Sequence, residues 1–476
     1  MRFKIMKQLR TLVLFVVAFV GLEVVTSCIS DEFTTSPSDI LTFSTDTVSF
    51  DTVFTEEGTP TARLKVFNRS KKSVNISSIK FEGNDNYFLM NVDGVSGKEF
   101  QDVEIRGNDS IFIFIECYIP EGGGNEPYLV EDNLRFVTNG ITQNVLVKAY
   151  GQNVTRLKGE VITTNTTLTA ERPYVVFDSL IVDKGATLFI EPGANILFHD
   201  KAKMIVRGSL NAVGEVGKMI NMRGDRLDNV LPDVGYDILA GQWDGITFEA
   251  ESFDNVMAYV DMRSTRTGLV VDSCSNLDRR KLVLVNSWLH NSQKSALESK
   301  YSWVEAYGCV FSEAANASVS LTGGKHKLVQ CTISNYYLFS VITEPLLCLY
   351  HCLPGHSEEN SELLMEAEIL NCILYGLPAD INEGDLTGSN VFLYNTSLKS
   401  YGTDDDNFIR CLWNTDPLFY TIREDYYFNY RLQEGSPVIG AGDPGFVGSL
   451  CRIDMDGKDR LADGNPDLGA YVYVPL

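Results

Sequence analysis

The sequence is poor in basic residues, histidine and proline. Its 476 residues include 40 Lys and Arg against 63 Asp and Glu, with 5 His and 15 Pro, and the formal net charge is −23. This acidity argues against nucleic acid, or an anionic lipid surface bound by a basic patch, as a partner. Collagen-like, mucin-like and wholly disordered chains are excluded, because hydrophobic residues make up 44% and aromatic residues 11% of the composition. A chain of this length is expected to form two or three domains.

The apolar run at the N-terminus is short. It occupies residues 11–22 and follows a positive segment that holds Arg2, Lys4, Lys7 and Arg10. Twelve residues are too few to span a bilayer as a helix, but they are typical of a signal peptide. The next residues, Val25-Thr26-Ser27-Cys28, resemble the lipobox of bacterial lipoproteins. The alternative is a plain secretory peptide with an incidental cysteine.

The lipobox resemblance implies that residues 1–27 are removed and that the sulfur of Cys28 carries the lipid. Residues 29–33, Ile-Ser-Asp-Glu-Phe, resemble the acidic stretch that sends some Gram-negative lipoproteins to the outer face of the outer membrane. The predicted location is therefore the outer membrane, with the protein lipid-anchored and facing the cell exterior. More than one acyl chain is needed for a stable anchor, and bacterial lipoprotein modification supplies them.

A short linker, residues 28–40, precedes a region of alternating apolar and polar residues at 41–153. Asn139-Gly140 lies between two such runs and is a strong hairpin signal. About seven short strands in this length predict an immunoglobulin-like (Ig-like) β-sandwich, although no Cys…Trp…Cys core pattern is present. No chemistry is evident in this domain, and we expect it to be a spacer.

Internal repeats dominate the rest of the chain. Five six-residue segments align on their third positions, Asn286, Gly308, Gln330, Asn371 and Asn395, at spacings of 22, 22, 41 and 24 residues. The first and last positions are apolar and predict a shared core, whereas the third suits a tight left-handed bend or an amide ladder. The fourth holds small residues. A period near 22 predicts the coils of a parallel β-helix, and the 41-residue interval is either two turns or one turn with an insertion.

Segments 174–177, 186–194, 206–210 and 241–246 resemble the opening coils of right-handed parallel β-helix proteins. Segments 416–419, 436–442, 454–460 and 467–471 resemble the closing region of surface β-helix proteins with interchangeable anchors. The predicted fold is all-β, with a right-handed parallel β-helix at 154–415 preceded by the Ig-like sandwich. Residues 416–476 are expected to cap the last coil, which would otherwise expose strand edges.

The cysteines have mostly structural interpretations. Cys309, Cys331 and Cys372 share the fourth column and are expected to stack inside the coils as reduced, small residues. Cys348, His351, Cys352 and His356 have the residue types of a zinc site, but the two types interleave, and Cys348 and Cys352 could equally form a local disulfide. We predict no metal there.

Candidate chemistry is sparse elsewhere. Asp454 opens a segment that resembles a calcium loop, but the spacing of its oxygen ligands fails, so its aspartates are predicted to cap turns. The Gly-His-Gly and Arg-Ile-Lys sets that pectate-degrading β-helix enzymes carry are absent. Both charge types occur on neighbouring predicted strands, at Asp261, Arg263, Arg266 and Asp272, a pattern that solvated strand faces also show.

Four tryptophans are candidates for stacking on sugars: Trp243, Trp288, Trp303 and Trp413. Trp288 falls outside the apolar columns and is expected to be exposed, whereas most aromatic residues are expected to build the core. The sequence thus predicts a lipoprotein that binds or adheres to polysaccharide or to a host or microbial glycan along the β-helix flank. We assign no catalytic residue, metal or cofactor, and no nucleic acid partner. The alternatives are a β-helix polysaccharide lyase or glycoside hydrolase, and a purely structural surface component.

Overall fold

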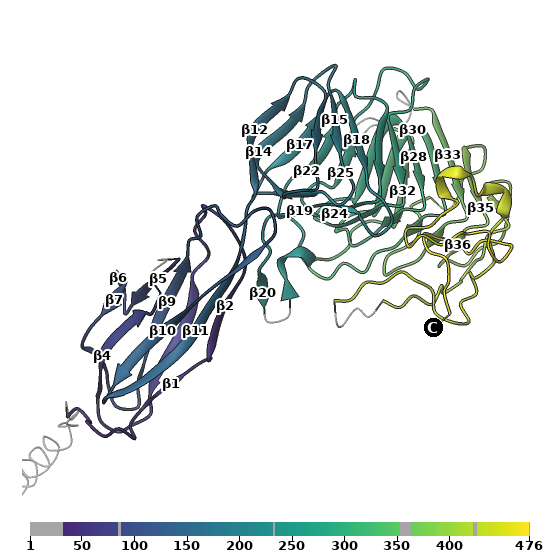
Figure 1. Cartoon of the computed structure of the whole chain (residues 1–476). Coiled ribbons are helices and arrows are strands. Elements are labelled where there is room, and N and C mark those ends of the chain that lie inside the picture. Colours follow the sequence, from purple (N-terminus) through teal and green to yellow (C-terminus); the bar gives the residue numbers. More distant parts are fainter. Residues whose placement is uncertain are drawn as a thin grey trace, which may run out of the picture. The chain divides into compact units, whose positions relative to one another are not determined.

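The structure is a computed structural model that describes residues 32–83, 87–231, 234–352, 363–383, 385–421 and 426–475. The predicted signal peptide and Cys28 lie outside these residues. The described chain is all-β, with no α-helix and with short 3-10 helices at Tyr236–Ile238, Pro444–Phe446 and Ser449–Cys451. Over the same ranges, no helix is long and apolar enough to cross a membrane. The chain divides into two compact units (Figure 1), one holding residues up to 121 with 127–152 and the other holding 122–126 with the residues from 153 onward.

The first unit consists of two sheets. A five-stranded sheet has the order β1-β3-β9-β5-β6, and a six-stranded sheet has the order β2-β11-β10-β4-β7, with β8 also paired to β4. The strands are β1 (Leu41–Phe43), β2 (Thr47–Phe54), β3 (Ala62–Asn68), β4 (Val74–Phe81), β5 (Phe88–Val92), β6 (Val95–Gly97), β7 (Glu99–Phe100), β8 (Val103–Ile105), β9 (Ser110–Cys117), β10 (Tyr128–Thr138) and β11 (Ile141–Gln152).

Alternation along these strands gives the first unit its core. Leu64, Ile76 and Ile113 are fully buried, and the residues next to them along each strand are not. The hairpin predicted at Asn139-Gly140 is confirmed, because these two residues join β10 to β11 and both have positive φ, 51° and 78°. Such angles match the turn that two-residue hairpins favour.

The second unit is built on one continuous sheet of 24 strands. Its strands are β12 (Thr155–Ile162), β13 (Thr166–Leu168), β14 (Tyr174–Val182), β15 (Thr187–Ile190), β16 (Asn195–Phe198), β17 (Lys203–Val206), β18 (Ser209–Val213), β19 (Ile220–Gly224), β22 (Gly245–Phe248), β23 (Asn255–Ala258), β24 (Val260–Thr265), β25 (Leu269–Val271), β26 (Leu282–Val285), β27 (Trp288–Ser292), β28 (Leu297–Tyr307), β29 (Val310–Phe311), β30 (Val319–Val329), β31 (Thr332–Ile333), β32 (Leu347–Tyr350), β33 (Met365–Leu370), β34 (Ile373–Leu374), β35 (Asn390–Tyr394), β36 (Ser397–Leu398) and β37 (Phe408–Ile409). A separate hairpin, β20 (Asn229–Leu231) and β21 (Val234–Gly235), projects between β19 and β22.

The 24 strands wind as a repeating coil. Each strand pairs in parallel with the equivalent strand of the next coil, which gives three stacks along the unit. One stack runs β16, β19, β24, β27, β29, β31, β34 and β36, and we call it the flank sheet. This winding of parallel strands is consistent with a β-helix (Figure 1).

The repeat columns have the structural roles that the sequence predicts. Asn286, Gly308, Gln330, Asn371 and Asn395 all have positive φ, between 43° and 64°. The apolar first and last columns all lie in the core of the second unit. Because β30 pairs directly with β33, the 41-residue interval is one turn with an insertion rather than two turns.

The C-terminal segment, residues 416–475, packs along the flank sheet. Its buried residues Tyr430, Leu468 and Tyr471 form a second hydrophobic cluster with Val310 and Ile373, which point outward from that sheet. Figure 1 shows the segment in yellow beside the later coils. At the final strand, β37, the aromatic rings of Phe408 and Trp413 pack together with 5.0 Å between their centroids, and both residues precede the C-terminal segment. The predicted cap at 416–476 therefore contacts the side of several coils.

Candidate functional site

Three neighbouring strands of the flank sheet, β19, β24 and β27, carry polar and aromatic side chains on their outer side. The inward residues of these strands, such as Met222, Met262 and Leu289, are buried in the core. The outward residues form two rows across the strands. Asn221, Asp261 and Trp288 are register partners in the first row. In the second row, Arg263 is the register partner of His290, and Arg223 follows the last recorded pair of β19 and β24, Met222 and Met262.

Asp261 is the centre of a charge network. Its carboxylate accepts a hydrogen bond from Arg263 and lies 3.0 Å from His290 Nε2. Burial alone would raise the pKa of Asp261, but the hydrogen bond and charge of His290, together with Arg263, outweigh burial and lower the pKa to about 2. Arg263 and Arg223 also lie 3.9 and 3.8 Å from the carboxylate of Asp237. The network is thus a set of mutually neutralised charges.

The C-terminal segment forms the opposite wall. Arg431 donates two hydrogen bonds of 2.6 Å to Asp456, and its guanidinium lies 4.4 Å from the ring centroid of Tyr471. Between this wall and the flank sheet is a hollow of about 580 Å³. We call it the Trp288 groove; its main lining residues are Asn221, Asp261, Trp288, Arg431, Asp456 and Tyr471.

Trp288 is held rigidly at the edge of the groove. Its ring stacks on His290 with centroids 4.2 Å apart, and its Nε1–H donates to Ser312 Oγ at 2.8 Å. The Tyr430 ring of the C-terminal segment lies edge-on to the Trp288 ring, with 6.3 Å between the two ring centroids. Tyr430 in turn donates to the buried carboxylate of Glu313, and burial raises the pKa of both groups. The ring is therefore fixed on several sides while part of it stays open to the groove.

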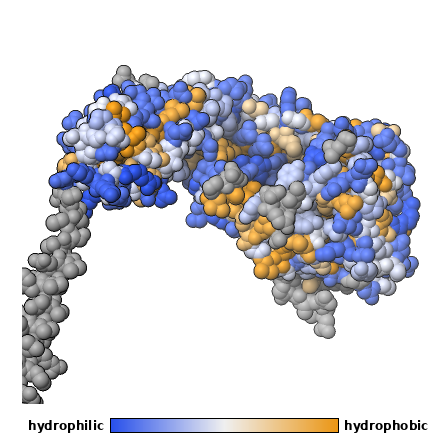
Figure 2. Space-filling view, turned by 90° about the horizontal axis from the view of Figure 1, so that it is seen from below, coloured by the Kyte–Doolittle hydropathy of each residue, from blue (hydrophilic) through white to orange (hydrophobic). Residues whose placement is uncertain are grey.

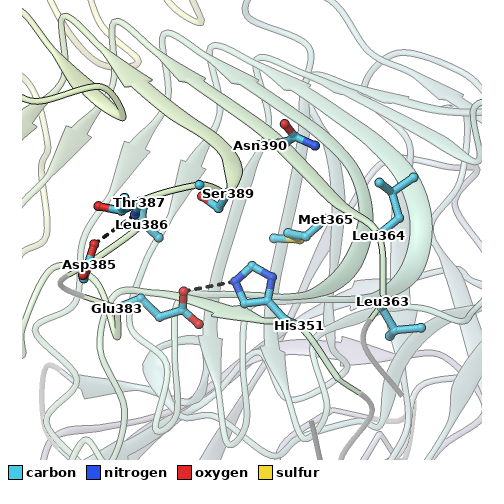
Figure 3. A pocket seen from close by; sticks show the side chains of 11 residues that line it. His351, Leu363, Leu364, Met365, Glu383, Asp385, Leu386, Thr387, Ser389 and Asn390 are labelled. Carbon is cyan, nitrogen blue, oxygen red and sulfur yellow. Dashed lines mark hydrogen bonds and ion pairs between the residues drawn. The ribbon is translucent and has the colours of Figure 1, made fainter. Parts of the chain in front are cut away.

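A second hollow of about 640 Å³ lies beside β32, β33 and the start of β35 (Figure 3). His351, just after β32, points toward Glu383, with 3.1 Å between Nε2 and the carboxylate. Met365 and Asn390 project from the two strands behind them. This hollow has one ion pair but no aromatic platform, and it borders residue 363, where the described chain resumes.

No family model matches this sequence. No curated protein matches it either. Among solved structures, a protein of unknown function from Porphyromonas gingivalis W83 is similar at 11% identity over 26% of this chain and 60% of its own, with a TM-score of 0.19. A family 123 glycoside hydrolase from Clostridium perfringens is similar at 10% identity over 24% of this chain and 25% of its own, with a TM-score of 0.17. The catalytic domain of a GH87 alpha-1,3-glucanase in complex with nigerose is similar at 9% identity over 75% of this chain and 88% of its own, with a TM-score of 0.26. Likenesses this weak indicate no function.

The residues considered for zinc do not gather in the described structure. His351 pairs with Glu383, whereas Cys348 is fully buried and burial raises its pKa to about 11. Cys348 and Cys352 are both free thiols rather than a disulfide. His356 lies outside the described residues. Over the described ranges, no three His, Cys, Asp or Glu side chains form a group that could hold a metal.

The four charged residues singled out on neighbouring strands separate into different places. Asp261 and Arg263 meet in the Trp288 groove network. Arg266 instead pairs with Asp200 at 2.8 Å and Asp244 at 3.0 Å. Asp272 contributes its backbone carbonyl, which accepts a hydrogen bond from the buried Lys281.

Of the four tryptophans, one lies in the core and three, including Trp288, which was expected to be exposed, are half-buried. Trp243 is fully buried and stacks on Phe198, with ring centroids 3.8 Å apart. Trp288 and Trp303 are partly exposed on different strands, and Trp303 donates to Glu305 at 3.0 Å. Trp413 packs near the last coil.

The remaining structural interpretations are confirmed. Cys309, Cys331 and Cys372 are fully buried in the core, and burial raises the pKa of Cys309 and Cys372. The Asp454 carboxylate accepts hydrogen bonds from the backbone N–H groups of Asp456 and Lys458, so it caps a turn.

Most of the groove was missed by the sequence argument. The sequence predictions assign no role to Arg223, Asp237 or Arg431, and they place Asp456 and Tyr471 only in turns and in the C-terminal cap. The spacing of Arg223 and Asn221 by two residues on a strand signals an outward face. For the residues of the C-terminal segment the sequence holds no comparable signal, because they meet the groove only through long-range packing.

Proposed function

We propose that the second unit is a right-handed parallel β-helix that binds a glycan in the Trp288 groove without cleaving it. The first unit is then an Ig-like sandwich that serves as a spacer. The lipobox resemblance at Cys28 supports a lipid anchor in the outer membrane, with the protein facing the cell exterior. Acidic composition suits a soluble surface of this kind.

The observation that carries the proposal is the composition of the groove. A sugar ring offers an apolar C–H face and a rim of hydroxyl groups. The partly open ring of Trp288 suits the apolar face, while Asn221 and the carboxylates of Asp261 and Asp456 suit the hydroxyls. A concave site with an aromatic surface and a few fixed polar groups is the usual form of a small-ligand site.

The charges of the groove favour binding over catalysis. A general acid or base works best when its pKa lies near the operating pH. With its pKa lowered to about 2, Asp261 stays ionised at neutral pH and holds no proton to give to a leaving group. The two carboxylate oxygens of Asp456 each accept a hydrogen bond from the Arg431 guanidinium. These carboxylates therefore act as fixed hydrogen-bond acceptors.

A glycan array probed with residues 29–476 tests the proposal, followed by product analysis of each hit. We expect retention of at least one polysaccharide with no shortened or unsaturated product. Trp288→Ala should then weaken binding by about 10- to 100-fold, since burying an aromatic side chain contributes about 1.5–3 kcal/mol.

Trp303→Ala is the matched control, because Trp303 is a partly exposed tryptophan on a different sheet stack. The Trp303→Ala variant should bind the polysaccharide as tightly as the unmodified protein. An array without hits among plant, host and microbial polysaccharides would count against glycan binding. Cleavage products that disappear in chelator would establish the lyase alternative instead.

A further inference from the structure

One end of the first unit gathers basic side chains. The loop between β3 and β4 carries Arg69, Lys71 and Lys72, and the loop between β8 and β9 carries Arg106, all of them exposed. The buried side chain of Asn68 ties the two loops together. Its amide donates to the carbonyl oxygens of Lys72, Ile105 and Arg106 at 2.8, 2.9 and 3.0 Å. We call Arg69, Lys71, Lys72 and Arg106 the basic tip.

Aromatic rings adjoin the basic tip on the outer face of the five-stranded sheet. Phe67 lies near the end of β3, and Phe112, near the start of β9, is 38% exposed. The Arg69 guanidinium lies 4.2 Å from the Phe67 ring centroid, and Lys65 Nζ lies 5.1 Å from the centroids of both Phe67 and Phe112. In Figure 2, hydrophobic residues likewise reach the surface in patches between hydrophilic ones. Exposed aromatic rings interleaved with cations are the composition of surfaces that lie in a lipid headgroup layer.

The described chain begins at this same end. Glu32 pairs with Lys72 at 2.8 Å, and the Thr34 N–H donates to the Ser73 carbonyl at 2.9 Å. Cys28 precedes Glu32 by four residues. At about 3.8 Å between successive Cα atoms, the two Cα atoms are at most about 15 Å apart. A lipid on Cys28 would therefore hold the basic tip within reach of the bilayer surface.

The local charge differs from that of the whole chain. The carboxylates at this end include Glu32, which pairs with Lys72; Asp39, which accepts from the Thr34 hydroxyl; and Asp109, which accepts from the Ser110 N–H. Two more lie nearby: Glu104, two residues before Arg106, and Asp93, whose N–H donates to the Phe112 carbonyl. Cations nevertheless gather here, since Arg63 and Lys65 lie over the Phe112 ring beside the basic tip, whereas the chain as a whole carries −23. The overall acidity argues against a broad basic surface but averages over this end.

We propose that the basic tip and the rings of Phe67 and Phe112 form a contact site for a bilayer surface whose lipid headgroups carry anionic phosphate. The cations meet phosphate groups, and the rings enter the headgroup layer. The contact orients the first unit on the membrane, a role that the tether alone does not supply. This inference rests on the lipid anchor of the proposed function.

Tryptophan reporters quenched by brominated lipid test the contact in the full lipidated chain. Phe112→Trp places a reporter at the tip. Tyr118→Trp is the matched control, because Tyr118 follows the other end of the same strand, β9, and is also exposed. Both are reconstituted into vesicles of equal parts phosphatidylglycerol and brominated phosphatidylcholine, and the quenching of the unmodified chain is subtracted. We expect extra quenching of Phe112→Trp alone, and its loss when Arg69→Glu and Lys71→Glu are added.

Equal quenching of the two reporters, or quenching of Phe112→Trp that survives both charge reversals, would overturn the contact. So would protection of the reporter by a soluble acidic polysaccharide without any response to vesicles. The intact mass of the protein reports the anchor separately. If Cys28 carries no acyl group, the anchor proposal fails, and quenching by added vesicles then decides the contact alone. An acylated chain without extra quenching refutes the contact and leaves the anchor standing.

Discussion

Asn371 should hold the C-terminal segment against the coils. This fully buried residue sits at a coil bend with φ of 53°. Its side-chain amide donates to the Asp443 carbonyl and accepts from the Asp443 N–H, both at 2.9 Å. Its own carbonyl accepts from the Gly469 N–H at 2.9 Å. Replacing Asn371 by glycine keeps the bend and removes both side-chain hydrogen bonds.

The expected loss follows from those two bonds. Each is worth about 1 kcal/mol net, and leaving a buried backbone group unsatisfied costs about 1–3 kcal/mol. Asn371→Gly should therefore destabilise the docked segment by about 2–4 kcal/mol. Asn371→Ala should cost about 1 kcal/mol more, because alanine is unfavourable at positive φ.

Asn395→Gly is the matched control. Asn395 occupies the same column with φ of 46°, but its amide nitrogen lies 3.5 Å from the Ala441 carbonyl and its buried Oδ1 has no hydrogen-bond partner. Its replacement should cost less than about 1 kcal/mol. Hydrogen exchange of Asp443 and Gly469, together with denaturant unfolding, measures both effects. Equal costs for Asn371→Gly and Asn395→Gly, or an alanine variant no worse than the glycine variant, would refute this reasoning.

Two further predictions concern titration. Burial lowers the pKa of His326 from 6.5 to about 4. As the pH drops from about 6.5 to about 4, the unfolded chain binds a proton on His326 that the folded chain does not. The free energy of unfolding should therefore fall by about 3 kcal/mol over this pH range. In His326→Gln, thermal melts across this range should lose that slope, and an unchanged slope would contradict the assignment. Asp261→Ala should cost about 3 kcal/mol at neutral pH by leaving Arg263 without its closest partner. Because the pKa of Asp261 is lowered from 3.8 to about 2, this difference should shrink only as pH falls through that interval; a gap that closes near neutral pH would be inconsistent with it.

The coil architecture was predictable because each coil repeats the same local problem. A tight bend needs a residue that tolerates positive φ, and the next position needs a small side chain, so Asn286, Gln330 and Asn371 mark the column even without an alignment. The Asn139-Gly140 hairpin was predictable for the same local reason. The structure of the 41-residue interval was not predictable, because one turn with an insertion and two regular turns can occupy the same number of residues.

The groove was only half predictable. Alternation places Asp261 and Trp288 outward, but it does not tell which outward residues face solvent and which face another segment. Arg431 and Tyr471 lie more than 140 residues beyond Trp288 in the sequence and approach it through apolar packing. The prediction that residues 416–476 cap the last coil meets the same limit, since a segment that covers strand edges and one that covers a flank are both rich in turns and apolar residues.

The position of the groove follows from a change of character along one row of the flank sheet. Asn221 and Asp261 are polar, whereas two later positions of the same row, Val310 and Ile373, are apolar and buried under the C-terminal segment. Trp288 lies at the boundary and touches both environments, through His290 on one side and Tyr430 on the other. Beyond this boundary, Arg431, Asp456 and Tyr471 of the C-terminal segment face the polar positions Asn221 and Asp261 and form the wall of the groove. The same hydrophobic packing that holds the C-terminal segment in place therefore also creates the site.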